Sequence, residues 1–196
     1  MICGGGLNEF KFINNTIKFL NINQEEFIFN EEKVIKYIDY QFDYGYYRFL
    51  YNKRFLKSKN IYFPNYLRYQ DPPFLIKAMS AAKQFYALKQ ITYYYRVSDK
   101  EWNNNKLIDQ YKGFIYSLSL CKSLKLNKLY FKIIQRLNTY IFLSPTKQFI
   151  NNKIINSLII KILNNIDYDL LDKENFSFKL DTFYKNLLNK TIYNNL

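Results

Sequence analysis

The chain has 196 residues, of which 48% are apolar and 20% aromatic, with a formal net charge of +13 and no histidine. The apolar content is that of a globular protein, which excludes a disordered chain, and a mean hydropathy of −0.33 excludes a multispan membrane protein. The lack of histidine excludes catalytic triads and metal sites that need imidazole. Acid–base chemistry therefore has to come from carboxylates.

The two cysteines, Cys3 and Cys121, are far apart in the sequence and form no CxxC motif. This spacing predicts neither a zinc site nor a disulfide framework. No window reaches the ~18 uninterrupted apolar residues that a spanning helix needs, and the first residues show no signal-peptide pattern. We therefore expect a cytoplasmic protein.

The positive charge comes from 24 Lys and only 5 Arg. Nucleic-acid binding is the obvious interpretation, but recognition of bases and phosphates favours the planar guanidinium of Arg. The abundant Lys, Asn, Ile, Tyr and Phe are all encoded by A/T-rich codons, so the base composition of the gene explains the bias whatever the function. A nucleic-acid partner is not expected from the charge alone.

The first part of the chain predicts short strands and one short helix. Residues 4–6 are three glycines and predict a flexible turn. Residues 9–13 and 16–20 are β-prone runs separated by two asparagines, which is typical of a hairpin. Residues 31–41 predict a short helix, which Gly45 ends.

A strand is predicted over residues 46–51, followed by a helix over residues 53–59 that Asn52 caps. The clearest local signal is Asp71 followed by two prolines, because Asp is a frequent N-cap and Pro is common at the first helical position. We expect a helix beginning at Asp71, with helix formers continuing to Leu88, and then a strand ending at Arg96.

Beyond Ser98 the pattern is helical. Asp99 is a candidate cap for the first helix, Pro145 predicts a turn, and residues 149–166 predict a buried helix. The predicted fold is therefore α+β and mostly helical, with a few-stranded sheet in residues 1–96. We expect two regions, residues 1–98 and a helical region of residues 99–196.

The basic residues are unevenly distributed, with nine basic and no acidic residues between Gln110 and Ile166. Five of them recur at three- and four-residue steps, which predicts one helical stripe opposite an apolar face. Such a stripe fits an anionic membrane surface, but the solvated face of a packed helix is the more common origin of this pattern. The stripe consists of Lys122, Lys125, Lys128, Lys132 and Arg136.

Several segments between residues 40 and 96 resemble bacterial family 2 glycosyltransferases of the GT-A fold, in the part that follows the nucleotide-binding half. The segment RYQDPPF begins at Arg68 and is the most specific of them. The resemblance covers about a third of the chain, is fainter in the first forty residues and is only compositional after Asn105. The residues that carry it are 40–49, 63–74, 83–87 and 93–96, with a fainter match at 2–5.

The resemblance implies that Asp71 is the general base that takes the proton from the acceptor hydroxyl. Elementary chemistry supports this role, because a helix N-terminus keeps a carboxylate ionised and oriented, although it also lowers its basicity. The alternative is that Asp71 only caps the helix. Arg68, Tyr69, Gln70 and Arg96 are the implied substrate-binding residues, and for Arg96 a structural role at the strand end is the alternative.

The resemblance also implies a nucleotide-sugar donor, a glycan or lipid-linked acceptor, and a divalent cation, Mn²⁺ or Mg²⁺, held by a DxD motif in the nucleotide-binding half. The only DxD by spacing here is Asp167-Tyr168-Asp169, which we interpret as a solvated turn before Leu170. We therefore expect no metal site in this chain, no activity from the chain alone, and a separate N-terminal half as a partner.

Two other interpretations remain open at this stage. One is a basic, aromatic-rich module without catalysis that stacks tyrosines on single-stranded nucleic acid, although the few Arg and the lack of a binding signature speak against it. The other is peripheral contact with the inner face of the cytoplasmic membrane, which is compatible with a glycosyltransferase that uses lipid-linked acceptors.

Overall fold

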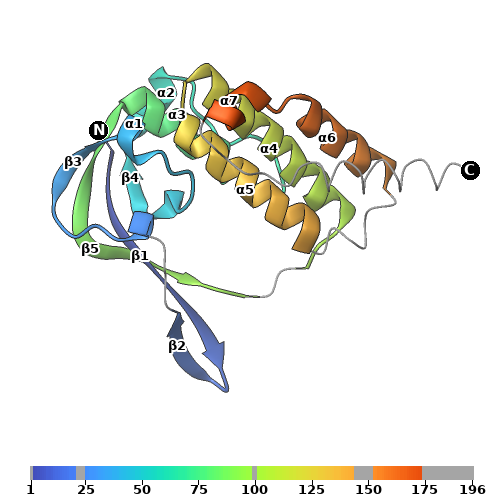
Figure 1. Cartoon of the computed structure of the whole chain (residues 1–196). Coiled ribbons are helices and arrows are strands. Elements are labelled where there is room, and N and C mark those ends of the chain that lie inside the picture. Colours follow the sequence, from blue (N-terminus) through green and yellow to red (C-terminus); the bar gives the residue numbers. More distant parts are fainter. Residues whose placement is uncertain (1, 21–24, 99–100, 144–151, 174–196) are drawn as a thin grey trace, which may run out of the picture. The chain divides into compact units, whose positions relative to one another are not determined.

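The structure is a computed structural model that describes residues 2–20, 25–98, 101–143 and 152–173 (Figure 1). It confirms a mostly helical α+β fold. The strands are β1 (Ile2–Ile13), β2 (Thr16–Leu20), β3 (Lys33–Lys36), β4 (Phe49–Tyr51) and β5 (Gln84–Arg96). The helices are η1 (Glu25–Phe27), α1 (Tyr37–Tyr40), η2 (Tyr46–Arg48), α2 (Lys53–Ser58), α3 (Asp71–Ala82), α4 (Asn104–Ser123), α5 (Asn127–Leu143), α6 (Lys153–Asn164) and α7 (Tyr168–Lys173), where η marks a 3-10 helix.

The chain divides into two compact units, Met1–Leu163 and Asn164–Leu196. The boundary that the sequence predicts after residue 98 lies inside the first unit. Within that unit α4 packs against both α3 and α5, so the helices that follow the sheet are joined to it by direct packing.

The sheet is mixed and is organised around β1. Its strand order is β2-β1-β5-β3, and β4 pairs with the first residues of β1. β1 runs parallel to β5 and antiparallel to β2 and β4, while β3 runs antiparallel to β5. The first and last strands in the sequence, β1 and β5, are therefore neighbours in the sheet.

The turn predicted over residues 4–6 is wrong, because the three glycines lie inside β1. The glycines are needed because the backbones of neighbouring segments approach β1 closely. A Cβ atom at Gly5 would lie 2.2 Å from the carbonyl oxygen of Gln90, and one at Gly4 would lie 2.5 Å from that of Arg48. Glycine is needed here for space and not for a turn.

The hairpin predicted from the two β-prone runs is confirmed. Asn14 and Asn15 have φ values of 50° and 61°, which places both turn residues in the left-handed region that a two-residue hairpin of this type requires. β1 pairs with β2 from Glu9 to Ile13, whereas its pairing with β5 ends at Phe10. The last residues of the hairpin therefore form a two-stranded ribbon.

Two local predictions between residues 31 and 51 are corrected. The helix expected over residues 31–41 is strand β3 followed by the single turn α1, because residues 33–36 pair with the start of β5. The strand expected over residues 46–51 begins as the 3-10 helix η2 and only its second half is β4. The Asn52 cap is confirmed, since its side chain accepts a hydrogen bond from the Phe55 amide at 3.1 Å.

Helix α3 begins at Asp71 as predicted, but Gln70 occupies the cap position, so Asp71 is the first helical residue rather than the cap. The helix ends at Ala82, six residues before Leu88, because Lys83 adopts a φ of 65° that leaves the helix. The strand predicted up to Arg96 follows directly as β5.

The continuous basic helix predicted from Lys122 to Arg136 is wrong. α4 ends at Ser123, and Lys125 has a φ of 54° in the turn before α5 begins. The five basic residues are thus shared between the end of one helix, a turn and the start of another. A single stripe along one helix does not exist.

The last described helices agree in part with the sequence. α6 buries four aliphatic side chains, as predicted for residues 149–166, whereas Asp99 and Pro145 lie outside the described residues. The solvated turn expected at Asp167 is corrected, because its carboxylate accepts a hydrogen bond from the Leu170 amide at 3.1 Å and α7 starts there. Among the described helices, none has the length and apolarity needed to cross a membrane.

Candidate functional site

Asp71 lies half-buried at the start of α3, beside the two tyrosines of η2. Burial raises the pKa of the Tyr46 hydroxyl, and the negative charge of Asp71 raises it further. The same charge contributes, after burial and the neighbouring Tyr95 and Glu9, to the raised pKa of Tyr47. The carboxylate and the two phenols are therefore close enough to interact electrostatically.

Tyr47 connects this carboxylate to the end of β5. Its ring lies 4.3 Å from that of Tyr93 and 5.5 Å from that of Tyr95, and it is nearly parallel to the latter. Tyr93 and Tyr95 are two residues apart on one strand, so they leave the sheet on the same face. Tyr93 keeps 38% of its surface exposed. The result is a partly exposed aromatic surface beside a carboxylate, which we call the Asp71 site: Tyr46, Tyr47, Asp71, Tyr93 and Tyr95.

The second side of the site is a set of stacked rings that fix η2 and the start of α3. Tyr46 packs edge-to-face against Phe63 at 5.1 Å, and Phe63 stacks on Phe74 at 3.9 Å. Phe74 lies three residues into α3 and is almost completely buried. These contacts hold the first turn of the helix in place, and with it the Asp71 carboxylate.

Two of the predicted substrate-binding residues, Arg68 and Tyr69, serve the packing of the loop that precedes α3. Tyr69 is 8% exposed, and its ring lies 4.3 Å from that of Phe114 on α4. It also fills the space above Gly113, where a Cβ atom would lie 2.7 Å from the Tyr69 ring. The guanidinium of Arg68 lies 4.9 Å from the Trp102 ring. The sequence motif is thus used largely to attach this loop to the helical region.

The other two predicted substrate-binding residues, Gln70 and Arg96, are placed differently relative to the Asp71 site. The side-chain oxygen of Gln70 is buried and meets no hydrogen-bond donor among the described residues. Arg96 pairs with Phe10 of β1, while Tyr95 pairs with Glu9, so Arg96 leaves the sheet on the face opposite to Tyr95. Gln70 therefore remains next to Asp71 in the chain, whereas the structure does not bring Arg96 to the Asp71 site.

Sequence reasoning missed the tyrosines of this site. Tyr46, Tyr47, Tyr93 and Tyr95 all lie in segments that carry the glycosyltransferase resemblance, but no role was predicted for them. Of the residues at this site only Asp71 was identified, from the glycosyltransferase resemblance together with its place at a helix start. The contact between η2 and β5 joins residues more than forty positions apart, and no spacing pattern reports such a contact.

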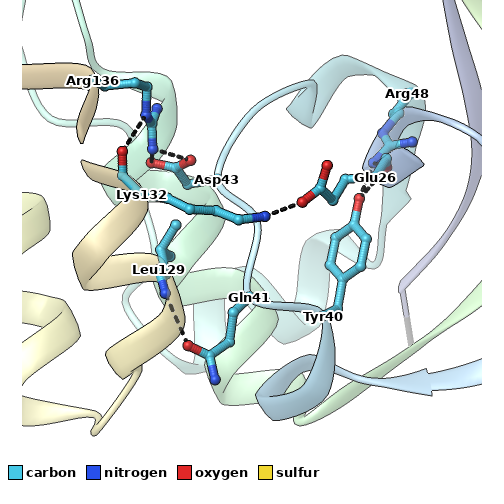
Figure 2. Close-up of polar contacts among 8 residues, drawn as sticks. All are labelled: Glu26, Tyr40, Gln41, Asp43, Arg48, Leu129, Lys132 and Arg136. Atoms are coloured by element: carbon cyan, nitrogen blue, oxygen red, sulfur yellow. Dashed lines mark hydrogen bonds and ion pairs between the residues drawn. The ribbon is translucent and has the colours of Figure 1, made fainter. Parts of the chain in front are cut away.

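Two basic residues of α5, Lys132 and Arg136, point toward the segments around α1, as Figure 2 shows. Arg136 donates from one guanidinium nitrogen to both carboxylate oxygens of Asp43, at 2.7 and 2.8 Å. Its guanidinium carbon lies 4.2 Å from the Tyr44 ring centroid. Burial alone lowers the pKa of Arg136, but the fully buried Asp43 carboxylate raises it well above its ordinary value. This is a buried ion pair between α5 and the loop after α1.

Two further contacts join the same helix to the sheet side. Lys132 forms an ion pair with Glu26 of η1, and the side-chain oxygen of Gln41 accepts a hydrogen bond from the Leu129 amide at 3.1 Å (Figure 2). Gln41 ends α1 with a φ of 45°, and its side-chain nitrogen donates to the Ile38 carbonyl oxygen at 2.6 Å, so the one amide group bridges α1 and the first turn of α5. We call the contacts of Glu26, Gln41 and Asp43 with α5 the α5 latch.

Arg48 is the most deeply buried cation in the described part of the chain, with 2% exposure. It donates to the carbonyl oxygens of Gly5 at 3.2 Å and Glu26 at 2.7 Å, and to the Tyr40 hydroxyl (Figure 2). Burial lowers its pKa, while the interaction with Tyr40 acts in the opposite direction. Arg48 therefore ties β1, η1 and α1 together and has no access to a substrate.

The remaining residues of the predicted stripe, Lys122, Lys125 and Lys128, are exposed at the turn between α4 and α5. Within the described ranges, no group of three or more Cys, Asp or Glu side chains is arranged to hold a metal ion. A comparison of the chain with protein-family models, with curated proteins and with solved structures finds no match.

Proposed function

We propose that this chain is the acceptor-side portion of a glycosyltransferase, and that the Asp71 site binds the sugar that receives the transferred residue. The observation that carries the proposal is the half-buried Asp71 carboxylate beside the stacked tyrosines of η2 and β5. The resemblance of residues 40–96 to family 2 glycosyltransferases supports it, because the site is built almost entirely from those segments.

The chemistry of a sugar matches this arrangement. A pyranose presents C–H groups on its faces, which pack against aromatic rings, and hydroxyl groups at its edges, which hydrogen-bond to carboxylates. In the proposed reaction the acceptor oxygen forms a bond to the anomeric carbon of the donor. The bond from that carbon to the nucleoside diphosphate breaks, and the leaving group keeps the electron pair. Asp71 takes the proton of the attacking hydroxyl.

The position of Asp71 suits a base that has to be ionised. The aligned peptide dipoles of α3 place partial positive charge at its start, which stabilises a carboxylate there, although Pro72 and Pro73 offer no N–H to it. Removing the charge without changing the shape, as in Asp71→Asn, therefore removes the proton acceptor and leaves the stacking surface.

The nucleotide sugar and its divalent cation, Mn²⁺ or Mg²⁺, belong in this proposal to a nucleotide-binding half, which the resemblance implies. The described residues do not fit a metal site, since they bring no three acidic or thiol ligands together. No step of the proposed reaction is derived through a metal. We expect the chain alone to bind an acceptor sugar and to transfer none.

Saccharide binding by the purified chain tests the proposal. Saturation-transfer NMR with the methyl glycosides of glucose, galactose and N-acetylglucosamine measures contact between sugar C–H groups and the protein. We expect a signal from at least one glycoside that Tyr93→Ala removes and Asp71→Asn retains. Tyr86→Ala is the matched control, because Tyr86 lies on the same strand with the same 38% exposure, outside the Asp71 site.

Two results would contradict the proposal. One is an absence of saturation transfer from all three glycosides to the folded wild-type chain. The other is an equal loss of signal in Tyr86→Ala and Tyr93→Ala, because the contact would then not be specific to the site. Circular dichroism of each variant shows that it is folded.

A further inference from the structure

The end of the β1–β2 hairpin exposes several large apolar side chains on one face. In an antiparallel ribbon, directly opposite residues share a face, so the pairs Phe10–Phe19 and Phe12–Ile17 lie together. Tyr94 of β5 joins them, with its ring 5.9 Å from that of Phe19. Phe12 is 53% exposed, Ile17 51%, Phe19 61% and Tyr94 54%. We call this surface the hairpin face: Phe10, Phe12, Ile17, Phe19 and Tyr94.

The charges around the hairpin face are mostly positive, with Glu9 at the base of the paired strands as the acidic exception. Lys11 and Lys18 are directly opposite each other on the other side of the ribbon, an arrangement that is unfavourable by itself. Arg96 leaves the sheet on the same side as the hairpin face, and Lys11, Phe12 and Arg96 line one shallow hollow. The sequence has no acidic residue from 10 to 20 or from 84 to 98.

From this combination we propose that the hairpin docks the chain on an anionic lipid bilayer. Aromatic and aliphatic side chains that share one face insert into the boundary between headgroups and acyl chains. The neighbouring Lys11, Lys18 and Arg96 meet the lipid phosphates, and long basic side chains reach the headgroup level while their stems remain apolar.

Charge complementarity selects this occupant over a second copy of the chain. Pairing two copies at this hairpin would bring together two surfaces that each carry Lys11, Lys18 and Arg96, and adding like charges to a ribbon that already has two opposed lysines is costly. An anionic bilayer instead supplies negative charge to a hairpin in which Glu9 is the one acidic residue beside Lys11 and Lys18. The surface stands independently of the Asp71 site, because it lies at the end of the ribbon.

The proposal also moves the expected membrane contact from the helices to the hairpin. Lys132 and Arg136, two of the five residues of the predicted stripe, are engaged in ion pairs with Glu26 and Asp43. The exposed lysines at the turn between α4 and α5 have no comparable apolar face around them. Of these two basic surfaces, the hairpin is the one whose lysines adjoin four large apolar side chains that are each more than half exposed.

Sedimentation of the full chain with vesicles of phosphatidylcholine, with and without 30 mol% (about a third) phosphatidylglycerol, tests the proposal. We expect binding to the anionic vesicles, and a loss of about tenfold in Lys11→Gln/Lys18→Gln and again in Phe12→Ser/Phe19→Ser. The matched control is Lys122→Gln/Lys125→Gln, which removes the same charge at the turn between α4 and α5 and should bind within about twofold of wild type.

A fluorescence measurement locates the contact. Trp102 is the single tryptophan, so a Trp102→Phe background accepts a probe elsewhere. In that background, the tryptophan introduced by Phe19→Trp should emit at shorter wavelength when anionic vesicles are added, and brominated lipids should quench its fluorescence. Leu50→Trp is the control, because Leu50 is 74% exposed on β4, which pairs with the opposite end of β1.

Three outcomes would overturn the proposal. They are equal binding to neutral and anionic vesicles, a greater loss from the α4–α5 turn variant than from the hairpin variants, and hairpin substitutions that dissociate a dimer in light scattering without changing vesicle binding. None of these measurements involves a sugar, so they succeed or fail separately from the glycosyltransferase proposal.

Discussion

Lys132 and Arg136 share one face of α5, and Lys11 and Lys18 share one face of the β1–β2 hairpin, yet the fold surrounds the two pairs differently. Lys132 and Arg136 meet Glu26 and Asp43 and are partly or largely withdrawn from water. Lys11 and Lys18, by contrast, are directly opposite each other on neighbouring strands. The spacing of charged residues shows that they share a face. Which groups they interact with depends on segments that are distant in the sequence.

The largest effect is expected from removing the carboxylate of the α5 latch. Asp43→Ala leaves the Arg136 guanidinium buried without its counter-ion, which should lower the free energy of unfolding by about 3–5 kcal/mol. Urea denaturation measures the change. Asp39→Ala, which removes an exposed carboxylate from α1, is the control and should stay within about 0.5 kcal/mol. A loss below about 1 kcal/mol in Asp43→Ala would show that the pair is not buried.

A somewhat smaller loss is expected at the second buried cation. Arg48→Met keeps an unbranched side chain of similar length but leaves the Gly5 and Glu26 carbonyl oxygens without their donor. We expect a loss of about 2–3 kcal/mol in urea denaturation, because buried acceptors remain unsatisfied. Arg54→Met, on the exposed surface of α2, changes the same side chain without this cost and should be close to neutral. Equal losses in the two variants would contradict the inferred role of Arg48.

The ion pair between Lys132 and Glu26 predicts a pH dependence. Burial raises the pKa of Glu26, but hydrogen bonding and charge from Lys132 outweigh it and leave the pKa below its ordinary value of 4.5. A carboxyl with a lowered folded-state pKa stabilises the fold above the unfolded value, and this contribution is lost as the pH falls through the folded value. As the pH is lowered below 5, the melting temperature should therefore fall more steeply for wild type than for Lys132→Met. Lys128→Met, which removes a more distant charge, should retain most of the wild-type slope, and identical slopes for wild type and Lys132→Met would contradict the pairing.

The smallest effect is expected on the hairpin and has the opposite sign. Lys18→Glu converts two directly opposed lysines into an oppositely charged pair with Lys11, which should raise the free energy of unfolding by about 0.2–1 kcal/mol. The control Lys36→Glu faces Gln84 on β5 and relieves no repulsion. A gain in Lys18→Glu together with weaker binding to anionic vesicles would show that the opposed lysines are retained at a cost in stability. No gain would show that solvent already screens them.

The sequence predicted turns and helix starts correctly where residues adjacent in the chain determine the local structure. The asparagine pair predicted the hairpin turn, Asn52 the start of α2, and Asp71 with its prolines the start of α3. The glycines at residues 4–6 were misread, because the same residue type serves a turn and a close approach of strands, and only the neighbours Gln90 and Arg48 distinguish the two.

The candidate site was predicted only in part for the same reason. Asp71 was identified from the glycosyltransferase resemblance and its place at a helix start, whereas its tyrosine neighbours come from η2 and β5 and became visible only once those elements were placed together. Arg96 was expected to contact substrate, but alternation along β5 turns it to the opposite face from Tyr95. A one-residue difference in register would have reversed that result.

The sequence by itself determined the α+β class, the hairpin, the beginning of α3 and the excess of positive charge. The tertiary structure decided which of those charges remain available, because the partner of Arg136 is Asp43, 93 residues earlier in the chain. It also decided that Tyr47 of η2 meets Tyr93 of β5, and thereby that Asp71 has an aromatic surface beside it. Spacing specifies the face on which a residue lies, whereas burial, ion pairing and ring stacking depend on contacts between segments that only folding brings together.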